Sequence, residues 1–241
     1  MPSSAPSIIA RLAALDWPAI DASLWARGFA HTAAVLTPEE CAALVALYDD
    51  DRRFRSRVVM ARHRFGEGEY KYFARPLPDV VQALREHSYP YLAPVASAWA
   101  EALGDPARYP ATHAEFVAAC HAAGQTRPTP LLLRYVEGGY NCLHQDLYGD
   151  VYFPLQMVVM LSEPEEDYGG GHFVLVENRP RAQSAAEVLR PRRGEAAIFT
   201  TRVRPVRGTR GYYRVGVRHG VTTLTRGARA TLGIVYHDAA G

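Results

Sequence analysis

The spacing of hydrophobic and polar positions changes once along the chain, near residue 130. Before that point, apolar residues mostly recur at the three- and four-residue intervals of amphipathic helices. We predict helices over residues 8–16, 17–27, 38–50, 79–103 and 111–123. The stretch Thr37-Pro38-Glu39-Glu40 has the cap, first-turn proline and glutamate of a helix start. Pro90 and Pro94 are expected to divide the fourth helix, because proline removes a backbone donor.

A few shorter elements complete the N-terminal half. Residues 1–7 are expected to lack regular structure, and residues 29–36 are predicted to form a short strand. Residues 54–62 and 70–73 are predicted to pair as a β-hairpin across the glycine-containing stretch between them.

After residue 130, short apolar runs alternate with turns marked by glycine and proline. We predict eight strands, over residues 131–136, 140–146, 152–162, 172–178, 187–190, 195–201, 211–219 and 229–236. Many short strands at such spacing are typical of a barrel or jelly roll. The sequence therefore predicts an α+β fold and a single domain, 1–241. A mainly helical part with a β-hairpin, 1–128, packs on a jelly-roll core, 129–238.

Composition indicates in which compartment the protein is expected. With 48% hydrophobic residues the chain can bury a large core, yet no apolar run reaches the length of a membrane span. The N-terminal residues lack the basic segment and long apolar core of a signal peptide. Three cysteines without a CxxC pair favour a reducing, cytoplasmic location.

The positive charge of the chain is concentrated in one segment. The whole chain carries +2, but residues 179–218 hold eleven arginines against two glutamates. Such a segment can attract a polyanion such as nucleic acid. Lys71 is the only lysine, however, so arginine supplies nearly all positive charge and the segment can also reflect composition. Both interpretations stay open at this stage.

Candidate chemistry begins at His144-Gln145-Asp146. In an extended segment, His144 and Asp146 point to the same face, which places an imidazole and a carboxylate together. Two histidines and one carboxylate form the facial triad of non-haem iron, which needs one more distant histidine. Nine histidines occur in the chain, and His113-Ala114-Glu115 is a chance match in a predicted helix.

The distal ligand and a charged anchor are expected near the C-terminus. His172 lies at an early turn and His237 has no strand after it, whereas His219 ends a predicted strand and precedes another. In that last strand Arg229 shares one face with Thr231, Gly233 and Val235. An arginine on a face of small or apolar residues needs a partner, and the carboxylate of a ligand would provide it.

These features together resemble the 2-oxoglutarate/Fe(II)-dependent dioxygenases over residues 131–238. His144-x-Asp146, the later His219 and Arg229 ten residues on follow the order and spacing of that superfamily. The run RYxxGxxxxLHQD resembles repair dioxygenases of the AlkB type, and HGVTTLTRGARATL resembles the prolyl-hydroxylase branch. As a whole, the chain resembles a bacterial family of 2OG-Fe(II) oxygenases sometimes associated with damaged DNA. The AlkB type has a second arginine where this chain has Tyr236 and His237.

The resemblance implies a double-stranded β-helix core and a set of site residues. Fe(II) would be held by His144, Asp146 and His219, with O2 and 2-oxoglutarate at the open positions. The far carboxylate of 2-oxoglutarate would pair with Arg229, helped by Thr231 and Tyr135. Arg226 is a rival anchor, but its strand parity is opposite to that of Arg229.

The orientation of the residues next to the motif can also be predicted. Gln145 should face away from the ligands. Cys142 should share their face, where it either lines the pocket or is a buried, inert thiol. The loop Phe65–Tyr72 is either a plain hairpin or a substrate lid.

Three functions remain open from the sequence. The resemblance favours an oxygenase that hydroxylates or oxidatively demethylates a substrate and releases succinate and CO2, with alkylated nucleic acid as one candidate substrate. A protein or peptide hydroxylase of the prolyl type is the second. A cupin-like barrel that binds metal or senses a ligand is the third, and it would have no need of Arg229.

Overall fold

The computed structural model describes residues 6–241, so the expectation for residues 1–7 lies largely outside the described residues. The helices are α1 (Ile8–Ala13), α2 (Trp17–Arg27), α3 (Pro38–Leu47), α4 (Asp79–Ala102) and α5 (His113–Ala122), with short 3-10 helices η1 (Asp51–Arg53) and η2 (Met60–His63). The helix start expected at residue 37 is present, because Thr37 and Glu40 form a capping box on α3. A second capping box, between Thr112 and Glu115, begins α5.

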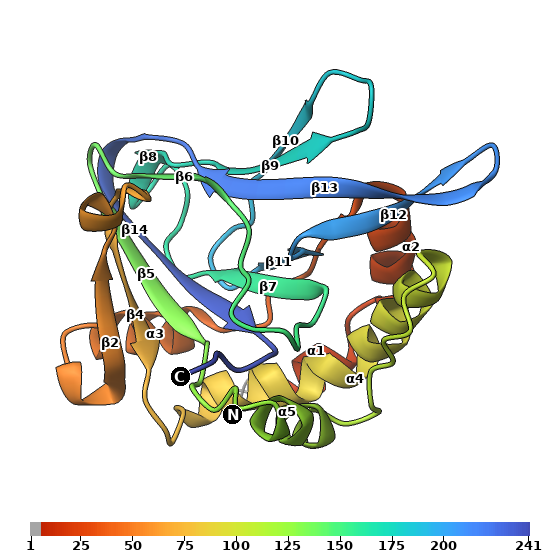
Figure 1. The fold of residues 1–241 in the computed structure, drawn as a ribbon. Helices are drawn as coiled ribbons and strands as arrows, with labels where there is room; N and C mark the ends of the chain where they lie inside the picture. The colour runs from red at the N-terminus through yellow and green to blue at the C-terminus, as the bar shows by residue number, and fades with distance from the viewer. Residues whose placement is uncertain (1–5) are drawn as a thin grey trace.

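The larger of two antiparallel sheets runs through the middle of the molecule (Figure 1). Its strands, in spatial order, are β1 (Phe29–His31), β11 (Ala196–Thr200), β7 (Leu155–Met160), β14 (Leu224–Val235), β5 (Leu131–Val136), β4 (Glu69–Phe73) and β2 (Phe54–Val59), with β8 (Tyr168–Gly170) paired to β14. Strands from the N-terminal half therefore extend the sheet at both edges. The predicted division of the chain at residue 128 stays a prediction.

The smaller sheet faces the larger one. In spatial order it contains β10 (Ala185–Leu189), β9 (Phe173–Asn178), β13 (Gly211–Val221), β6 (Tyr140–His144) and β3 (Gly66–Glu67), with β12 (Val203–Gly208) paired to β13. Two facing antiparallel sheets of interleaved strand order form a jelly roll. The α+β class and the jelly-roll core predicted from the sequence are confirmed.

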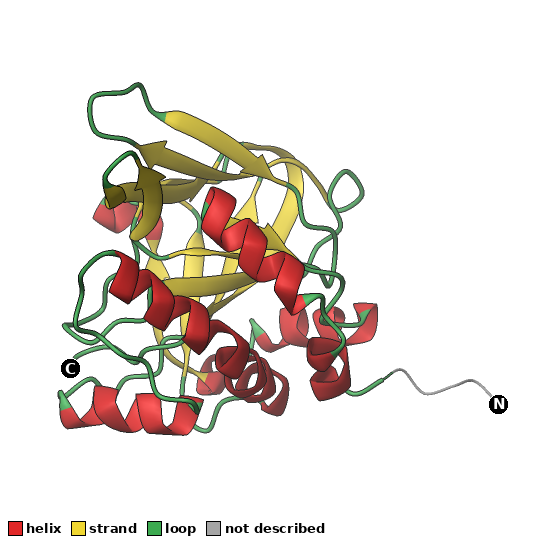
Figure 2. Cartoon of the chain, turned by 90° about the vertical axis from the view of Figure 1, so that its right-hand side faces the viewer, coloured by secondary structure: helices red, strands yellow, loops and turns green. Residues whose placement is uncertain are grey.

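Most of the helices lie beneath the strands in Figure 2 and cover the outer face of the larger sheet. Strand alternation decides which residues meet them. On β7, Met157 and Val159 pack against the helical layer, whereas Val158 and Met160 face the smaller sheet. Both faces of β7 are thus mainly apolar, and residues 155–161 form one continuous buried run.

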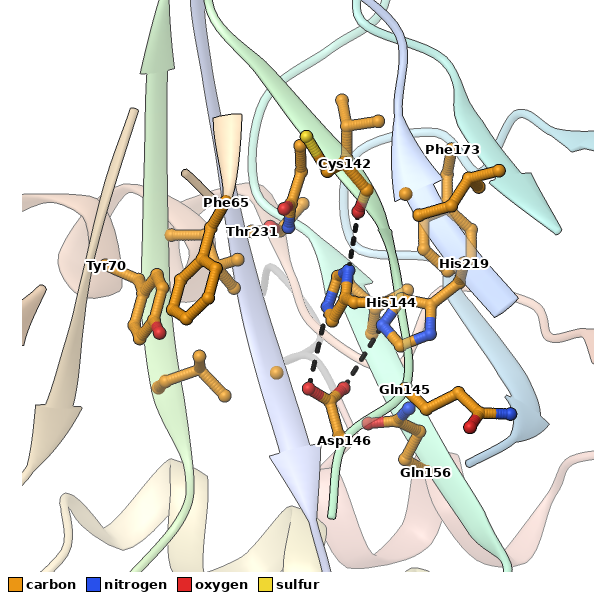
Figure 3. A pocket seen from close by; sticks show the side chains of 18 of the residues that line it. Phe65, Tyr70, Cys142, His144, Gln145, Asp146, Gln156, Phe173, His219 and Thr231 are labelled. Carbon is orange, nitrogen blue, oxygen red and sulfur yellow. Dashed lines mark hydrogen bonds and ion pairs between the residues drawn. The ribbon is translucent and has the colours of Figure 1, made fainter. Parts of the chain in front are cut away.

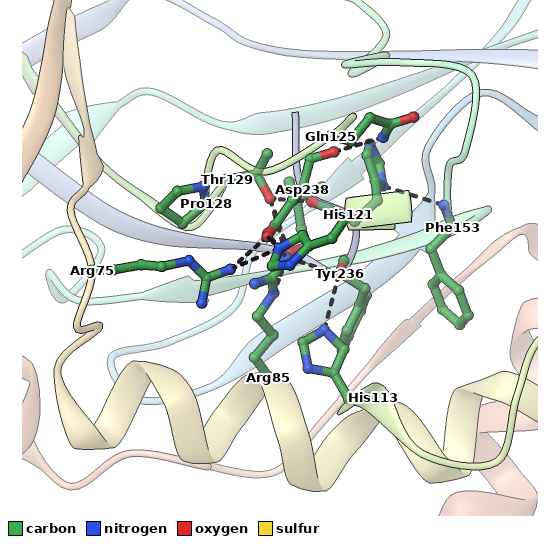
Figure 4. A network of polar contacts seen from close by, with 12 residues as sticks. Arg75, Arg85, His113, His121, Gln125, Pro128, Thr129, Phe153, Tyr236 and Asp238 are labelled. Carbon is green, nitrogen blue, oxygen red and sulfur yellow. Dashed lines mark hydrogen bonds and ion pairs between the residues drawn. The ribbon is translucent and has the colours of Figure 1, made fainter. Parts of the chain in front are cut away.

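A buried polar network fixes the segment after β14 to the helices (Figure 4). The carboxylate of Asp238 is fully buried and accepts from Arg85 at 2.8 Å and from Arg75 at 2.5 Å. Arg85 also donates to the carbonyl oxygens of Val235 and Tyr236. A buried ion pair needs such additional bonds to offset the loss of water. The network holds the end of β14 in one position relative to α4.

One prediction about the helices was wrong. Pro90 and Pro94 do not divide α4, which is continuous from Asp79 to Ala102. Both prolines lie on the exposed side of the helix. Carbonyl groups that lose their intrahelical partner there can bind water, while the opposite side packs on the sheet.

Several strand boundaries also differ from the prediction. Strand β1 ends at His31 rather than residue 36, and β6 ends at His144, so Asp146 lies in the following loop. Strands β8 and β12 were not predicted, because glycine, proline and arginine interrupt their apolar pattern. None of the described helices is both long and apolar enough to cross a membrane.

Candidate metal centre and cavity

Three predicted ligands converge between the two sheets, as Figure 3 shows. His144 ends β6 and lies directly across from His219 of β13 in the strand register. Asp146 reaches the same point from the loop after β6. Its Oδ2 lies 3.1 Å from Nε2 of His219, and its Oδ1 lies 3.5 Å from Nε2 of His144. Ligand atoms of all three residues lie within 4.8 Å of one another.

The backbone defines the tautomer of His144. Its Nδ1 lies 2.8 Å from the carbonyl oxygen of Cys142, which can only accept a hydrogen bond. Nδ1 therefore carries the proton and donates it, and Nε2 keeps a free lone pair on the side of Asp146. A metal-binding histidine commonly has this arrangement, because the second bond orients the ring.

The protonation states favour cation binding. Burial opposes ionisation of Asp146, but the neighbouring His219 and His144 and the hydroxyl of Tyr148 outweigh it and hold its pKa below the ordinary value. Burial, together with the adjacent His219, lowers the pKa of His144. A carboxylate beside a neutral imidazole is the protonation state that a divalent cation requires.

Tyr148 is a contact of the site that the sequence reasoning missed. Its hydroxyl donates to Oδ1 of Asp146 at 2.9 Å and accepts from Tyr72 at 3.1 Å. Burial raises the pKa of Tyr148 well above its ordinary value, so the hydroxyl keeps its proton. Its spacing in the sequence was the signal that could have identified it. His144, Asp146 and Tyr148 follow one another at intervals of two residues.

A cavity of about 360 Å³ contains these ligands and extends between the sheets. Arg229, Thr231 and Gly233 of β14 line it together, as their predicted common face requires. Tyr135 lines it from β5, directly opposite Arg229 in the register. The predicted cosubstrate residues and the three metal-ligand candidates thus border a single cavity, while their roles stay predictions.

Arg229 lacks a complete set of partners within the described residues. Its side chain is 1% exposed, and its Nε and Nη2 have no hydrogen-bond acceptor. The nearest aromatic rings, those of Tyr135 and Tyr168, lie 5.7 and 6.0 Å from the guanidinium carbon. A buried guanidinium without an acceptor is costly, and an anionic ligand in the cavity would satisfy it.

Two further buried groups around the cavity lack a hydrogen-bond partner in the described part of the chain. These are the hydroxyl of Tyr135 and Nε2 of Gln156 on β7. Burial raises the pKa of Tyr135, so its hydroxyl remains a donor. The sequence reasoning did not select Gln156, although an amide in the apolar run LQMVVM is a visible signal.

The alternative histidines and arginine lie elsewhere. Arg226 is exposed and binds the backbone oxygen of Glu165, so it does not line the cavity. His237 is buried, and its Nδ1 accepts from the backbone of Phe153 at 3.2 Å. His113, the chance match, begins α5 and bonds the carbonyl oxygen of Tyr236.

The residues next to the ligands adopt distinct roles. The amide of Gln145 donates to the carbonyl oxygens of Arg202 and Val217, which ties the loop after β6 to β13. Cys142 lines the cavity and is exposed. In Figure 3, Phe65 and Tyr70 lie across the cavity from His144, so the predicted hairpin forms part of its wall.

The chain matches the Oxygenase-NA family over residues 68–239; the family is described as "Oxygenase, catalysing oxidative methylation of damaged DNA". Two uncharacterised proteins of Mycobacterium tuberculosis, from strains CDC 1551 and H37Rv, are each 49% identical over 168 residues. The aligned residues make up 70% of this chain and 72% of each relative.

Solved structures extend the similarity to the fold. A prolyl-4-hydroxylase from Pseudomonas putida is 15% identical, with a TM-score of 0.55 over 93% of this chain and all of that one. An oxidoreductase of the 2OG-Fe(II) oxygenase family from Burkholderia pseudomallei is 16% identical, with a TM-score of 0.56 over 93% of each chain. At such identities the similarity concerns the fold alone.

Proposed function

Because the chain belongs to the Oxygenase-NA family, we propose that it is a 2-oxoglutarate/Fe(II)-dependent dioxygenase whose cavity oxidises a substrate C–H bond with release of succinate and CO2. Fe(II) and 2-oxoglutarate are its cofactor and cosubstrate, and O2 is the oxidant. The observation that carries the proposal is the buried, incompletely paired Arg229 in the same cavity as the three ligand candidates.

The donor set suits Fe(II). Two imidazole nitrogens and one carboxylate oxygen, from His144, His219 and Asp146, are the ligands of the facial triad. Such a triad leaves open positions for a cosubstrate and O2. When bound, Fe(II) supplies the redox chemistry by which O2 and 2-oxoglutarate oxidise the substrate. The protein contributes the orientation of these ligands.

The far end of the cavity suits a dicarboxylate. Arg229 offers Nε and Nη2 without acceptors, and Tyr135 offers a free hydroxyl proton. Thr231 is buried on the same face of β14 and lines the same cavity. A carboxylate at this end would pair with Arg229 in a bidentate manner and accept from Tyr135, which removes the desolvation cost of these groups.

The surrounding side chains keep water from the reacting groups. Phe173, Phe199 and Val158 pack around the cavity between the sheets. The ring of Phe199 lies 5.0 Å from that of His219 in an edge contact. These apolar neighbours lower the local dielectric and restrict His219 to one orientation.

For the substrate, we propose alkylated nucleic acid. The description of the family names damaged DNA as the substrate of its members. The positive segment of the chain supports a polyanion, because several of its arginines are exposed. A peptide hydroxylase is the second candidate, since the fold is similar to a prolyl-4-hydroxylase.

One spectroscopic experiment tests the cofactor proposal. Under anaerobic conditions, Fe(II) and 2-oxoglutarate added to the protein should give a weak visible charge-transfer band, absent in His144→Ala. Absence of the band in the wild-type protein would contradict the proposal. Arg229→Met should lower the affinity for 2-oxoglutarate at least about 100-fold, the loss of roughly two charged hydrogen bonds. Arg226→Met is the matched control and should change nothing.

A second experiment separates the substrates. A repair enzyme should remove the alkyl group from methylated single strands, with one succinate formed for each group removed. A peptide hydroxylase should instead add the mass of one oxygen to a peptide. Succinate formation with a peptide and not with methylated strands would replace the nucleic-acid assignment.

A further inference from the structure

A β-hairpin, β12 and β13 with their turn, projects beyond the body of the protein, at the right of Figure 1. We name residues 202–218 the arginine hairpin. Neither aspartate nor glutamate occurs between Glu195 and Asp238, whereas the hairpin itself contains six arginines. The hairpin is therefore a positive projection without an internal acid.

The arginines of the hairpin fall into two groups. Arg204, at the base, is buried and pairs with Glu177 at 2.6 Å, so it serves the structure. The other five are exposed, and of these Arg202, Arg207, Arg210 and Arg218 have no carboxylate within 4.0 Å among residues 6–241. Only the second group offers free charge to a partner.

Strand alternation arranges the free charges along one face. On β13, residues 215, 217 and 219 are buried, and Arg214 and Arg218 point to the opposite, exposed side. Arg207 lies directly across from Tyr212 on that side, and Arg210 occupies the turn. Arg214 approaches Asp105 at 3.6 Å but its side chain stays 54% exposed.

The hairpin also carries aromatic surface. Tyr212, on the same side as Arg207, is 42% exposed, and Tyr213, on the opposite side, is 37% exposed. The ring of Tyr212 lies 5.6 Å from that of Trp25 on α2, which fixes the hairpin to the body. A partly exposed ring beside arginines, as at Tyr212, suits single-stranded nucleic acid, because a base can stack on the ring while the arginines contact phosphates.

The β-strand β13 connects this surface to the metal centre. Strand β13 begins at the tip with Gly211 and reaches the ligand candidate His219 eight residues later. At about 3.3 Å per residue the two points are roughly 26 Å apart. At the duplex rise of about 3.4 Å per nucleotide, this span corresponds to roughly eight stacked nucleotides, and to fewer nucleotides of an extended single strand.

We propose that the exposed face of the arginine hairpin binds the phosphate backbone of the single strand whose modified base enters the cavity. The inference rests on the proposed function, which it deepens by naming the anchoring surface. The hairpin contributes affinity for long strands and leaves the chemistry at His144, Asp146 and His219 unchanged.

The test reverses the charge at the tip. The double variant Arg207→Glu/Arg210→Glu is compared with Arg52→Glu/Arg53→Glu, which makes the same charge change on η1. Binding of labelled methylated strands of 4, 8 and 16 nucleotides is measured by fluorescence anisotropy at several salt concentrations. The hairpin variant should bind the 16-mer at least about tenfold more weakly. For this variant, the slope of log Kd against log salt concentration should fall by about 1.4, because each of two lost phosphate contacts contributes about 0.7.

Turnover gives the second readout. The wild-type protein should show a lower KM for the 16-mer than for the 4-mer, and the hairpin variant should lose this difference at unchanged kcat. Equal binding and equal KM in both double variants would overturn the inference. Stronger binding of poly-glutamate than of single strands, with the same loss in the hairpin variant, would instead assign the surface to an acidic protein.

Failure of this inference is distinguishable from failure of the proposed function. If wild-type protein demethylates the 4-mer and 16-mer equally well, the hairpin has no anchoring role but the oxygenase assignment stands. If the anaerobic Fe(II) and 2-oxoglutarate band is absent from wild-type protein, the proposed function itself fails.

Discussion

Replacing Tyr148 with phenylalanine removes one hydroxyl group from the ligand sphere and keeps the ring. That hydroxyl donates to Oδ1 of Asp146 at 2.9 Å and accepts from Tyr72 at 3.1 Å. It leaves Oδ2 of the carboxylate available to a metal. Without it, Asp146 can rotate, and Oδ1 loses its donor in a largely buried position.

Two independent magnitudes agree on the size of the effect. A hydrogen bond to a charged group contributes about 1.5–3 kcal/mol. Loss of a contact that orients a ligand typically costs about 10–100-fold in metal affinity, or about 1.4–2.8 kcal/mol. Tyr148→Phe should therefore raise the Kd for Fe(II) by about 10–100-fold.

The assay is isothermal titration of metal-free protein with Co(II) and, anaerobically, with Fe(II). Tyr70→Phe is the matched control, because Tyr70 lines the same cavity without a hydrogen bond to Asp146. Tyr72→Phe should have a smaller effect than Tyr148→Phe, since it acts through Tyr148. Unchanged metal affinity in Tyr148→Phe would refute this reasoning, as would a larger loss in Tyr72→Phe.

Three further predictions concern stability and the cavity. Arg85→Met leaves the buried carboxylate of Asp238 without its fully buried partner and should lower the free energy of unfolding by about 3–5 kcal/mol in urea titrations, whereas the partly exposed Arg75→Met should cost about 1 kcal/mol or less. Burial lowers the pKa of His113 to about 3 from 6.5, so the unfolded chain binds more protons below pH 6.5. Unfolding free energy should thus fall as pH drops from 6.5 toward 3, and His113→Gln should reduce this slope; an equal slope in both proteins would contradict the assignment. Gly171→Ala should weaken 2-oxoglutarate binding, because at a backbone φ of +56° the added Cβ would lie 2.7 Å from Cδ1 of Leu224 and 3.2 Å from Cδ of Arg229, and both side chains would have to move. Unchanged affinity in calorimetry would count against it.

The inward face of β14 was predictable because strand alternation is a local property. Arg229 and Thr231 share a face whatever the surrounding fold, and that face lines the cavity. The capping box at Thr37 was predictable for the same reason, since its bonds span only three residues.

Contacts between distant segments were not predictable. Asp238 meets Arg85 across 153 positions, and the pattern of neither segment indicates the other. The hydroxyl of Tyr148 reaches Asp146 through the path of a loop, which has no periodicity to extrapolate. Whether an arginine of the positive segment is free or paired likewise depends on partners such as Glu177, which only the folded structure brings close.

The position of β14 in the larger sheet has a consequence for the order of folding. It is the last strand in the described sequence, yet it lies between β7 and β5 and pairs with both. The two halves of the sheet can therefore join only after residues 224–235 have been synthesised. Until then the pairs β7–β11 and β4–β5 lack their central neighbour, and their apolar faces stay exposed. Long-range pairing of this kind slows folding. Pulse-labelling hydrogen exchange should show β5 and β7 gaining protection together, at the moment when β14 inserts between them.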